Sequence, residues 1–477
     1  MMAVSPAGVF IVIFSLYLFL RGNNSFYKLF LLCLVTEVFF RKGYILNIGE
    51  SYLKYDLYAE YILILYGVLH LNKVESKYFR AWLLLLSSFV IPMFLLIIFP
   101  SNIWVAGGDF TWDEILYYGR QPVHPTVSSL VVWMTVKVSS FALVFLYIYQ
   151  TWGEIEYKKI ICDFSKISNY FIIIGVIEFV FKDILNLNDL WGDSLMMIMG
   201  DTPGAFFEGR LRGSVFELNL FTQEASHYAI SLNYICLVKF VNNIIYNKRK
   251  LVDIYMWGAM FLMVLSTSFS TIYLLAEFWG IFLIHRWFIR KPIHKKTEIT
   301  FFCVCIFLLI ISFVAILVTI ADSEIGIRIQ AIYENLDIIL SSDWVEGSAI
   351  GDMSSQARLV SIIQTLIAFS KRPFFGYSLM SMSAHSVFAV YLASVGIYGL
   401  LCWYKFYFSI CPIRKFTMPC KRVLLLCILL HLLSNLMGGD IRMFYGAMLL
   451  LIVICFCFIS VPQLKNHFNR NHYDNRS

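Results

Sequence analysis

Residues 357–401 read ARLVSIIQTLIAFSKRPFFGYSLMSMSAHSVFAVYLASVGIYGLL. The first part has the pattern of an amphipathic helix, because Arg358 and the polar residues three, six and seven positions later share one face while apolar residues share the other. Pro373 ends that helix, and Gly376 lets the backbone turn. From His385 the chain is apolar for about the 20 residues that a bilayer crossing needs. The stretch therefore predicts an interfacial helix, a polar turn and a membrane span, with a histidine at the membrane surface.

The composition of the whole chain agrees with this interpretation. Of the 477 residues, 59% are apolar and only 14% are charged, and the mean hydropathy is +0.73. These values exclude an ordinary soluble protein and are typical of a polytopic membrane protein. The net charge of +7 is expected of basic residues at the cytoplasmic ends of spans, and because no basic tract is interleaved with aromatic residues, we expect no nucleic-acid partner.

Thirteen apolar runs have nearly the length of a membrane crossing. They lie at residues 3–20, 26–40, 55–71, 81–100, 129–150, 167–186, 223–241, 251–267, 271–288, 300–320, 385–410, 423–437 and 443–461. The first run lacks a positive leader and a small-residue cleavage site, so it is predicted to be a span and not a removed signal peptide. Residues 41–56, between the second and third runs, form either a short external hairpin or a displaced helix. We predict an all-α fold of about 13 transmembrane helices in one domain, residues 1–477.

The distribution of lysine and arginine sets the predicted orientation, because cytoplasmic loops collect these residues. Alternate segments between the runs carry 24 of the 38 basic residues and are placed in the cytoplasm. Long loops at about 101–128, 187–222 and 321–384 then lie outside, as does the N-terminus, and the C-terminus lies inside. Two amphipathic patterns in the third loop, at 325–340 and 357–371, predict interfacial helices. We therefore expect the functional groups on the outer face.

The first external loop combines aromatic residues with acids, among them Trp104, Asp109, Trp112 and Asp113. A sugar ring stacks on an aromatic face, and a carboxylate accepts hydrogen bonds from sugar hydroxyls. The alternative for both tryptophans is an aromatic belt at the membrane interface, which we favour slightly.

Several ionisable residues fall inside or beside the apolar runs, including Lys137, Glu178, Lys182 and Glu277. A charge at this depth is costly unless it is paired or faces water. These side chains are therefore expected to pair internally or to line a cavity.

Four features occur together in residues 357–401: an arginine on the helix, Pro373-x-x-Gly376, a histidine that opens a span, and Gly396-x-x-Gly399 within that span. In this combination the stretch resembles the signature of the bacterial O-antigen polymerase and O-antigen ligase superfamily. The resemblance implies a GT-C-like membrane glycosyltransferase, with functional roles for the helix arginine, Arg358, and for His385.

The second external loop resembles another part of the same family pattern, which is an arginine, a nearby glycine and then Glu-Pro-Ser or Pro-Asn at the start of a span. Arg210 and Gly213 match the first part. The remainder can be matched at Glu217, by distance from the arginine, or at Glu224, by position at a helix start, and both places lack the proline. We favour Glu224, because the helix dipole stabilises a carboxylate there. His227 follows three residues later on the same helix face.

The arginines suit a donor sugar that hangs from a lipid pyrophosphate. A guanidinium fork matches phosphate oxygens in a bidentate way, and it can neutralise the charge that develops on the leaving group. The candidates for this role are Arg210, Arg212, Arg358 and Arg372, with Arg212 counted among the catalytic groups.

The attacking sugar hydroxyl needs a base, which typically contributes about 10²–10⁴-fold. His385 is the first candidate because histidine titrates near neutral pH and because the resemblance implies a functional histidine at this position, and Glu224 is the second. Glu217 and His227 are candidate substrate contacts. No Asp-x-Asp motif or His-rich cluster is present, so we expect neither a metal nor a cofactor.

Together with the external position of these groups, the resemblance implies an enzyme of the bacterial inner membrane that polymerises undecaprenyl-pyrophosphate-linked repeat units on the periplasmic face. Its partners would be the lipid-linked glycan and the bilayer, and the resemblance implies a chain-length regulator and a flippase as well. An O-antigen ligase, which moves finished glycan to lipid A core, has nearly the same signature and is the first alternative. A polysaccharide transporter or flippase is the alternative of another class, although such a protein would more often show an inverted repeat.

Overall fold

The computed structural model describes residues 2–21, 26–40, 43–48, 51–70, 74–107, 115, 121–152, 154–200, 211–212, 215–216, 218–222, 225–246, 251–266, 270–284, 353–384 and 386–410. Most of these residues are helical. The helices are α1 (Pro6–Leu20), α2 (Phe26–Phe39), α3 (Tyr55–Leu69), α4 (Ser76–Ile98), α6 (Ser129–Thr151), α7 (Glu154–Phe179), the π-helical turn η3 (Val180–Ile184), α8 (Asn188–Met199), α9 (Ala225–Ile245), α10 (Ile254–Leu265), α11 (Ser270–Ile284), α15 (Met353–Lys371) and α16 (Val387–Ile410). The strands are β1 (Met2–Val4), β2 (Leu46–Ile48), β3 (Ser51–Leu53), β4 (Leu211–Arg212) and β5 (Val215–Phe216).

The apolar runs of the sequence coincide with helices wherever the structure describes them, from 3–20 to 271–288 and again at 385–410. Within the described ranges, four helices are long and apolar enough to cross a membrane: Tyr78–Ile98, Ser129–Ile148, Lys158–Ile184 and Ala389–Phe406. The predicted spans at 300–320, 423–437 and 443–461, and the predicted helix at 325–340, lie outside the described residues. The protein is therefore mostly helical, with helices suited to a membrane.

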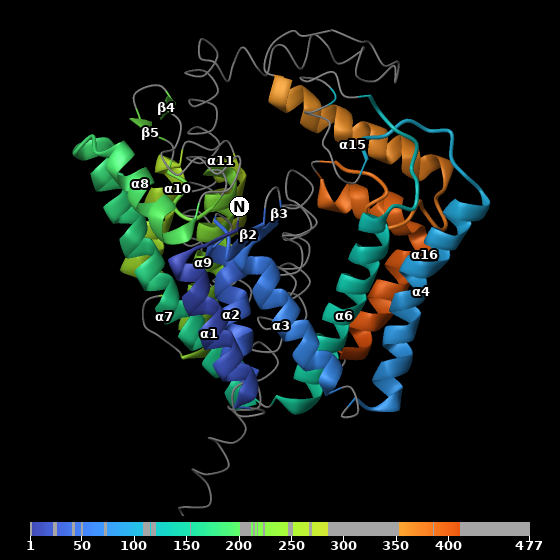
Figure 1. The fold of residues 1–477 in the computed structure, drawn as a ribbon, viewed down its shortest axis with the longest axis horizontal. Coiled ribbons are helices and arrows are strands. Elements are labelled where there is room, and N and C mark those ends of the chain that lie inside the picture. The colour runs from blue at the N-terminus through green and yellow to red at the C-terminus, as the bar shows by residue number, and fades with distance from the viewer. Residues whose placement is uncertain are drawn as a thin grey trace, which may run out of the picture.

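The helices form two groups (Figure 1). Helices α4, α6, α15 and α16 make one group, in which α16 packs along α4, and α1, α2 and α7 to α11 make the other. Helix α3 joins them, because it packs on α2 in one group and on α6 in the other. Strands β1 to β5 and residues 372–384 gather at one end of this bundle, which we call the loop end. The segments that the charge distribution predicts to be external therefore share one end.

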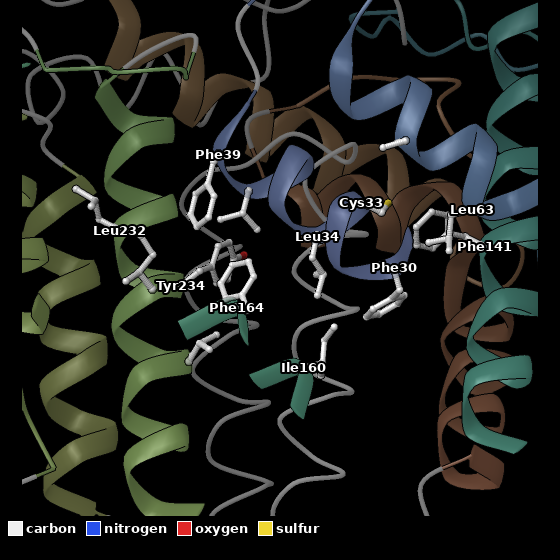
Figure 2. Packing of buried hydrophobic residues seen from close by; sticks show 14 of the residues in the cluster. Phe30, Cys33, Leu34, Phe39, Leu63, Phe141, Ile160, Phe164, Leu232 and Tyr234 are labelled. Atoms are coloured by element: carbon white, nitrogen blue, oxygen red, sulfur yellow. The ribbon is translucent and has the colours of Figure 1, made fainter. Parts of the chain in front are cut away.

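Helix α2 lies at the centre of the packed core (Figure 2). Its Phe39 stacks on Phe171 of α7 at 4.2 Å between ring centroids, while Phe30 and Cys33 lie toward α3 and α6. Each of these α2 side chains is at most 1% exposed. Because lipid tails are as apolar as this core, close packing and dispersion hold the helices together more than transfer from water does.

A small sheet organises the loop end. Strand β2 pairs antiparallel with both β1 and β3, so residues 41–56 contain a hairpin, the first of the two forms that the sequence allows. Ser5 caps α1 by accepting from the amide of Gly8 (3.0 Å), and its hydroxyl is 2.7 Å from that of Tyr55. Tyr55 donates in turn to the carbonyl of Met199 (2.7 Å). This network ties the starts of α1 and α3 to the end of α8.

Two helices differ from the sequence-based expectation. Helix α7 begins at Glu154, within the segment 151–166 that we expected to be a basic loop, and Asp163 on it accepts from the hydroxyl of Tyr27 (2.6 Å). Helix α8 lies within the expected loop 187–222. Its Leu195 and Met199 are buried on the protein side, while Met197 is 80% exposed on the other side. The Asn, Asp and Gly residues of this segment resemble a loop in sequence, and packing on α1 stabilises the helix instead.

Helix α15 is the amphipathic helix that residues 357–371 predict, and it turns its polar face inward. Ser361 and Thr365 are at most 2% exposed, whereas Leu366 on the opposite face is 42% exposed. This is the reverse of the pattern on a water-soluble surface, and it suits a helix that lies against lipid.

Candidate functional site

The structure describes the predicted site residues to different extents. His227 and Arg372 are described with their side chains, Arg212 belongs to strand β4, and Arg358 belongs to helix α15. The remaining candidates lie outside the described residues: Arg210, Glu217, Glu224 and His385. The site is therefore built from the segments that carry these residues.

Helix α16 is broken in its middle, and the turn before it fills the break. Gly396 has φ of 63° and ψ of −168°, so the helical hydrogen bonds are interrupted there. The amides of Ile397 and Tyr398 donate instead to the carbonyls of Pro373 (2.8 Å) and Phe374 (2.9 Å). On the other side of the break, the amide of Tyr377 donates to the carbonyl of Ala393 (3.0 Å), and that of Ser378 to Ser394 (2.8 Å). Four backbone hydrogen bonds thus join the turn to the helix.

Glycine is required at both sides of this junction. Gly376 has φ of 70°, and a methyl carbon built on it would lie 2.5 Å from the carbonyl carbon and oxygen of Ser394. A methyl carbon on Gly396 would lie 2.5 Å from the carbonyl carbon of Phe374. The Pro-x-x-Gly and Gly-x-x-Gly elements of the sequence are therefore two halves of one structural unit.

The loop after this junction is buried and strained. Ser378 and Met380 are non-glycine residues with φ of 83° and 60°, and residues from Tyr377 to Met382 are at most 6% exposed. The hydroxyl of Ser381 donates to the carbonyl of Ser378 (2.8 Å) and closes a tight turn. Such backbone strain persists only where the surroundings hold it. Ala384 and Ser386, the chain neighbours of position 385, follow directly.

Arg372 holds this loop to the end of α4. Its guanidinium donates to the carbonyls of Phe99 and Pro100, the latter at 3.1 Å, and lies 5.0 Å from the centre of the Tyr377 ring. Burial raises the pKa of the Tyr377 phenol, although a hydrogen bond with Ser101 and the charge of Arg372 act in the opposite direction. Arg372 thus has a structural role, because it links the turn to the carbonyls that follow α4. Its contact with pyrophosphate stays a prediction.

The first external loop is joined to the same unit. The amide of Ser383 donates to the carbonyl of Ala106 (2.9 Å), next to Val105, which forms an antiparallel bridge with Val123. Trp104 stacks on His124 at 3.9 Å, and Nδ1 of His124 donates to the carbonyl of Ile103 (2.7 Å). The described parts of the first and third loops are therefore joined at the loop end.

The second loop is attached to the other group of helices. Strands β4 and β5 form a two-residue-long hairpin, in which Arg212 pairs with Val215. The amide of Phe216 donates to Asp183 of η3 (2.7 Å), and the amide of Leu220 donates to Glu178 of α7. The hairpin with Arg212 and helix α15 with Arg358 lie on opposite sides of the loop end (Figure 1).

His227 lies near the start of α9 and is half-buried, and its carbonyl accepts from the hydroxyl of Ser231 (3.0 Å). Across the described part of the chain, no three His, Cys, Asp or Glu side chains come together as a metal site would require. Two described turns at the loop end carry a predicted cationic residue: the β4–β5 hairpin carries Arg212, and the turn after α15 carries Arg372.

The expectation that charges in the spans pair internally is confirmed for two pairs. Lys137 of α6 lies 2.5 Å from Glu60 of α3, and Lys182 lies 2.9 Å from Glu178. All four side chains are at most 3% exposed. Sequence reasoning did not assign any of them to the site. The signal for Glu178 was its charge within an apolar run, and the missing information was its contact with the second loop.

No protein-family model matches the chain, and no curated protein is detectably similar to it. The motif residues, and the way in which the fold joins them, are therefore the features that indicate a function.

Proposed function

We propose that this protein is a membrane glycosyltransferase that polymerises undecaprenyl-pyrophosphate-linked oligosaccharide repeat units, as in O-antigen or related polysaccharide synthesis. In this proposal the chain forms one GT-C-like domain of about 13 transmembrane helices in the bacterial inner membrane. The loop end faces the periplasm. A chain-length regulator and a flippase are its proposed partners.

The proposed reaction forms one glycosidic bond and breaks one bond to phosphate. The acceptor sugar hydroxyl attacks the anomeric carbon of the donor sugar, His385 or Glu224 takes the hydroxyl proton, and the lipid pyrophosphate leaves. Arg212, together with Arg210, Arg358 and Arg372, neutralises the charge on the departing pyrophosphate. Glu217 and His227 contact the glycan. In this scheme side chains carry out both the proton transfer and the stabilisation of the leaving group, and no metal is used.

One observation carries the proposal furthest. The two halves of the motif on which the resemblance is based, Pro373 to Gly376 and the Gly396 break, are joined by four backbone hydrogen bonds. Broken helices in membrane proteins occur where the backbone is buried in protein or lines a polar site. A purely anchoring span would not need this construction, and the segment that it fixes leads directly to position 385.

The test is an assay on purified protein in nanodiscs, supplied with lipid-linked repeat units from cells that lack this gene and with a chelator. Wild-type protein is expected to produce a ladder of longer glycans, and Arg212→Ala and His385→Ala are expected to lose it. Arg21→Ala and His70→Gln are matched controls, because both residues lie at the ends of α1 and α3 opposite the loop end. They should keep the ladder.

Two other outcomes decide against the proposal. If products appear only when lipid A core is added, the protein is a ligase. If no glycosidic bond forms and the lipid-linked unit crosses the bilayer of sealed vesicles, the protein is a transporter and the enzyme proposal is wrong.

A further inference from the structure

A fully buried ion pair lies where α7 passes into the π-helical turn η3. The ammonium of Lys182 is 2.9 Å from the carboxylate of Glu178, and both side chains are fully buried. A buried ion pair rarely contributes net stability by itself, because removing two charges from water or headgroups costs about as much as their attraction returns. We therefore expect the Glu178 carboxylate to have a further role besides its pairing with Lys182.

The carboxylate of Glu178 holds the second loop. The amide of Leu220 lies 3.1 Å from each of its two oxygens, so one N–H is shared between them. Leu220 is fully buried and has φ of 42°, in the left-handed region that a non-glycine residue seldom occupies. The charge on the acceptor makes this a strong hydrogen bond, and it offsets the cost of the strained backbone.

Two further contacts fix the same segment. Asp183 accepts from the amide of Phe216 (2.7 Å), four residues before Leu220. The turn continues at Thr222, whose amide and hydroxyl both donate to the carbonyl of Asn219 (2.8 and 2.6 Å). Residues 218–222 are at most 9% exposed. The hydrogen bonds to Glu178 and Asp183 thus attach this segment to α7 and η3, and we call this arrangement the clamp.

The π-helical turn makes this arrangement possible. Residues Val180–Ile184 begin two positions after Glu178 and form a wider helical turn, which shifts Lys182 and Asp183 relative to a regular α-helix. One turn before Glu178 on α7, Gly175 leaves room for the hydroxyl of Tyr228, which a methyl group would displace. Such turns are frequent at functional sites, where they re-aim side chains.

We propose that Glu178, paired with Lys182 and assisted by Asp183, positions the second loop for the reaction. The clamped residues lie between Arg212 and Glu224 in the chain, and they join the β4–β5 hairpin to the start of α9. Glu178 acts through this segment and is a positioning residue, not a catalytic one. The inference rests on the proposed function for its catalytic consequence, while the clamp itself is independent of the substrate.

The test separates the clamp from the charge. In Glu178→Leu/Lys182→Leu both charges disappear together, so the fold is expected to survive, but the Leu220 amide loses its acceptor. In Glu178→Gln/Lys182→Met the charges also disappear, yet the side-chain carbonyl still accepts from Leu220. Glu60→Leu/Lys137→Leu is the matched control, because it removes an equally buried ion pair at the α3–α6 contact.

Hydrogen exchange of residues 216–222 is the first measurement. In the Leu/Leu variant of Glu178 and Lys182, the Leu220 amide should exchange about 10- to 100-fold faster than in wild type. The Gln/Met variant and the Glu60/Lys137 control should stay close to wild type. Unchanged protection in the Leu/Leu variant would overturn the clamp.

Glycan polymerisation is the second measurement, in nanodiscs with the lipid-linked repeat units described above. The Leu/Leu variant should lose about tenfold or more in kcat with a smaller change in KM, and the Gln/Met variant should recover most of it. A Leu/Leu variant that loses protection but keeps kcat overturns the positioning role. If wild-type protein forms no polymer, the proposed function fails, together with this catalytic consequence, and the exchange result still decides whether the clamp exists.

Discussion

Replacing Gly376 by alanine should destabilise the protein, because it separates the turn at residues 373–378 from the broken helix α16. The left-handed backbone costs an L residue about 1–2 kcal/mol. The new methyl carbon would also lie 2.5 Å from the carbonyl of Ser394, which is backbone and cannot rotate away. Relief of that overlap separates the turn from the helix and weakens the hydrogen bonds from Tyr377 (3.0 Å) and Ser378 (2.8 Å). At about 1 kcal/mol for each bond, the total loss is about 3–4 kcal/mol.

Gly280→Ala is the matched control for this prediction. Gly280 lies inside α11, and a methyl carbon there would meet no atom within 4 Å. Because alanine is the better helix former, this change should be neutral or stabilise by up to about 1 kcal/mol. Unfolding of the purified proteins by SDS in mixed micelles, followed by circular dichroism, measures both. If Gly376→Ala unfolds at the same SDS fraction as Gly280→Ala, the junction does not contribute as the structure implies.

Three further outcomes are expected. Glu60→Leu alone leaves the Lys137 ammonium without its carboxylate and should destabilise by about 3–5 kcal/mol in the same titration, whereas replacing both residues should be nearly neutral. Arg372→Ala should lower the free energy of unfolding by about 1–3 kcal/mol, because the carbonyls of Phe99 and Pro100 after α4 lose their donor, and Arg372→Lys should recover part of this loss. If Arg372→Ala is fully stable but no longer polymerises, Arg372 acts on the substrate alone. A cysteine at the exposed position Gln121 should react with a membrane-impermeant maleimide in intact spheroplasts, while one at Glu75 should react only after permeabilisation, and the opposite pattern would reverse the proposed orientation.

The helices themselves could be predicted because their signal is local. Helices α6 and α16 begin and end within a few residues of the apolar runs at 129–150 and 385–410. Hydropathy measures how a segment interacts with lipid, and it needs no knowledge of distant residues. The same local reasoning fails at α8, whose helical form depends on the burial of Leu195 and Met199 against another helix.

The candidate site was only partly predictable, for the same reason. Charge and residue type pointed to Arg372, but its carbonyl partners at Phe99 and Pro100 are more than 270 positions away in the chain. The sequence likewise marked Glu178 as a charge in a span without indicating that Leu220 would donate to it. A hydrogen bond across such distances depends on how helices pack, which no short pattern encodes.

The sequence by itself therefore determined that this is a helical membrane protein, where most of its helices run, and which turns carry glycine and proline. Only the tertiary structure decided that Pro373–Gly376 inserts into the break at Gly396, and that a buried ion pair holds the second loop. The physical reason is that spans form in response to the surrounding lipid, one segment at a time. The polar backbone groups of a broken helix and a buried charge, in contrast, must find partners elsewhere in the chain.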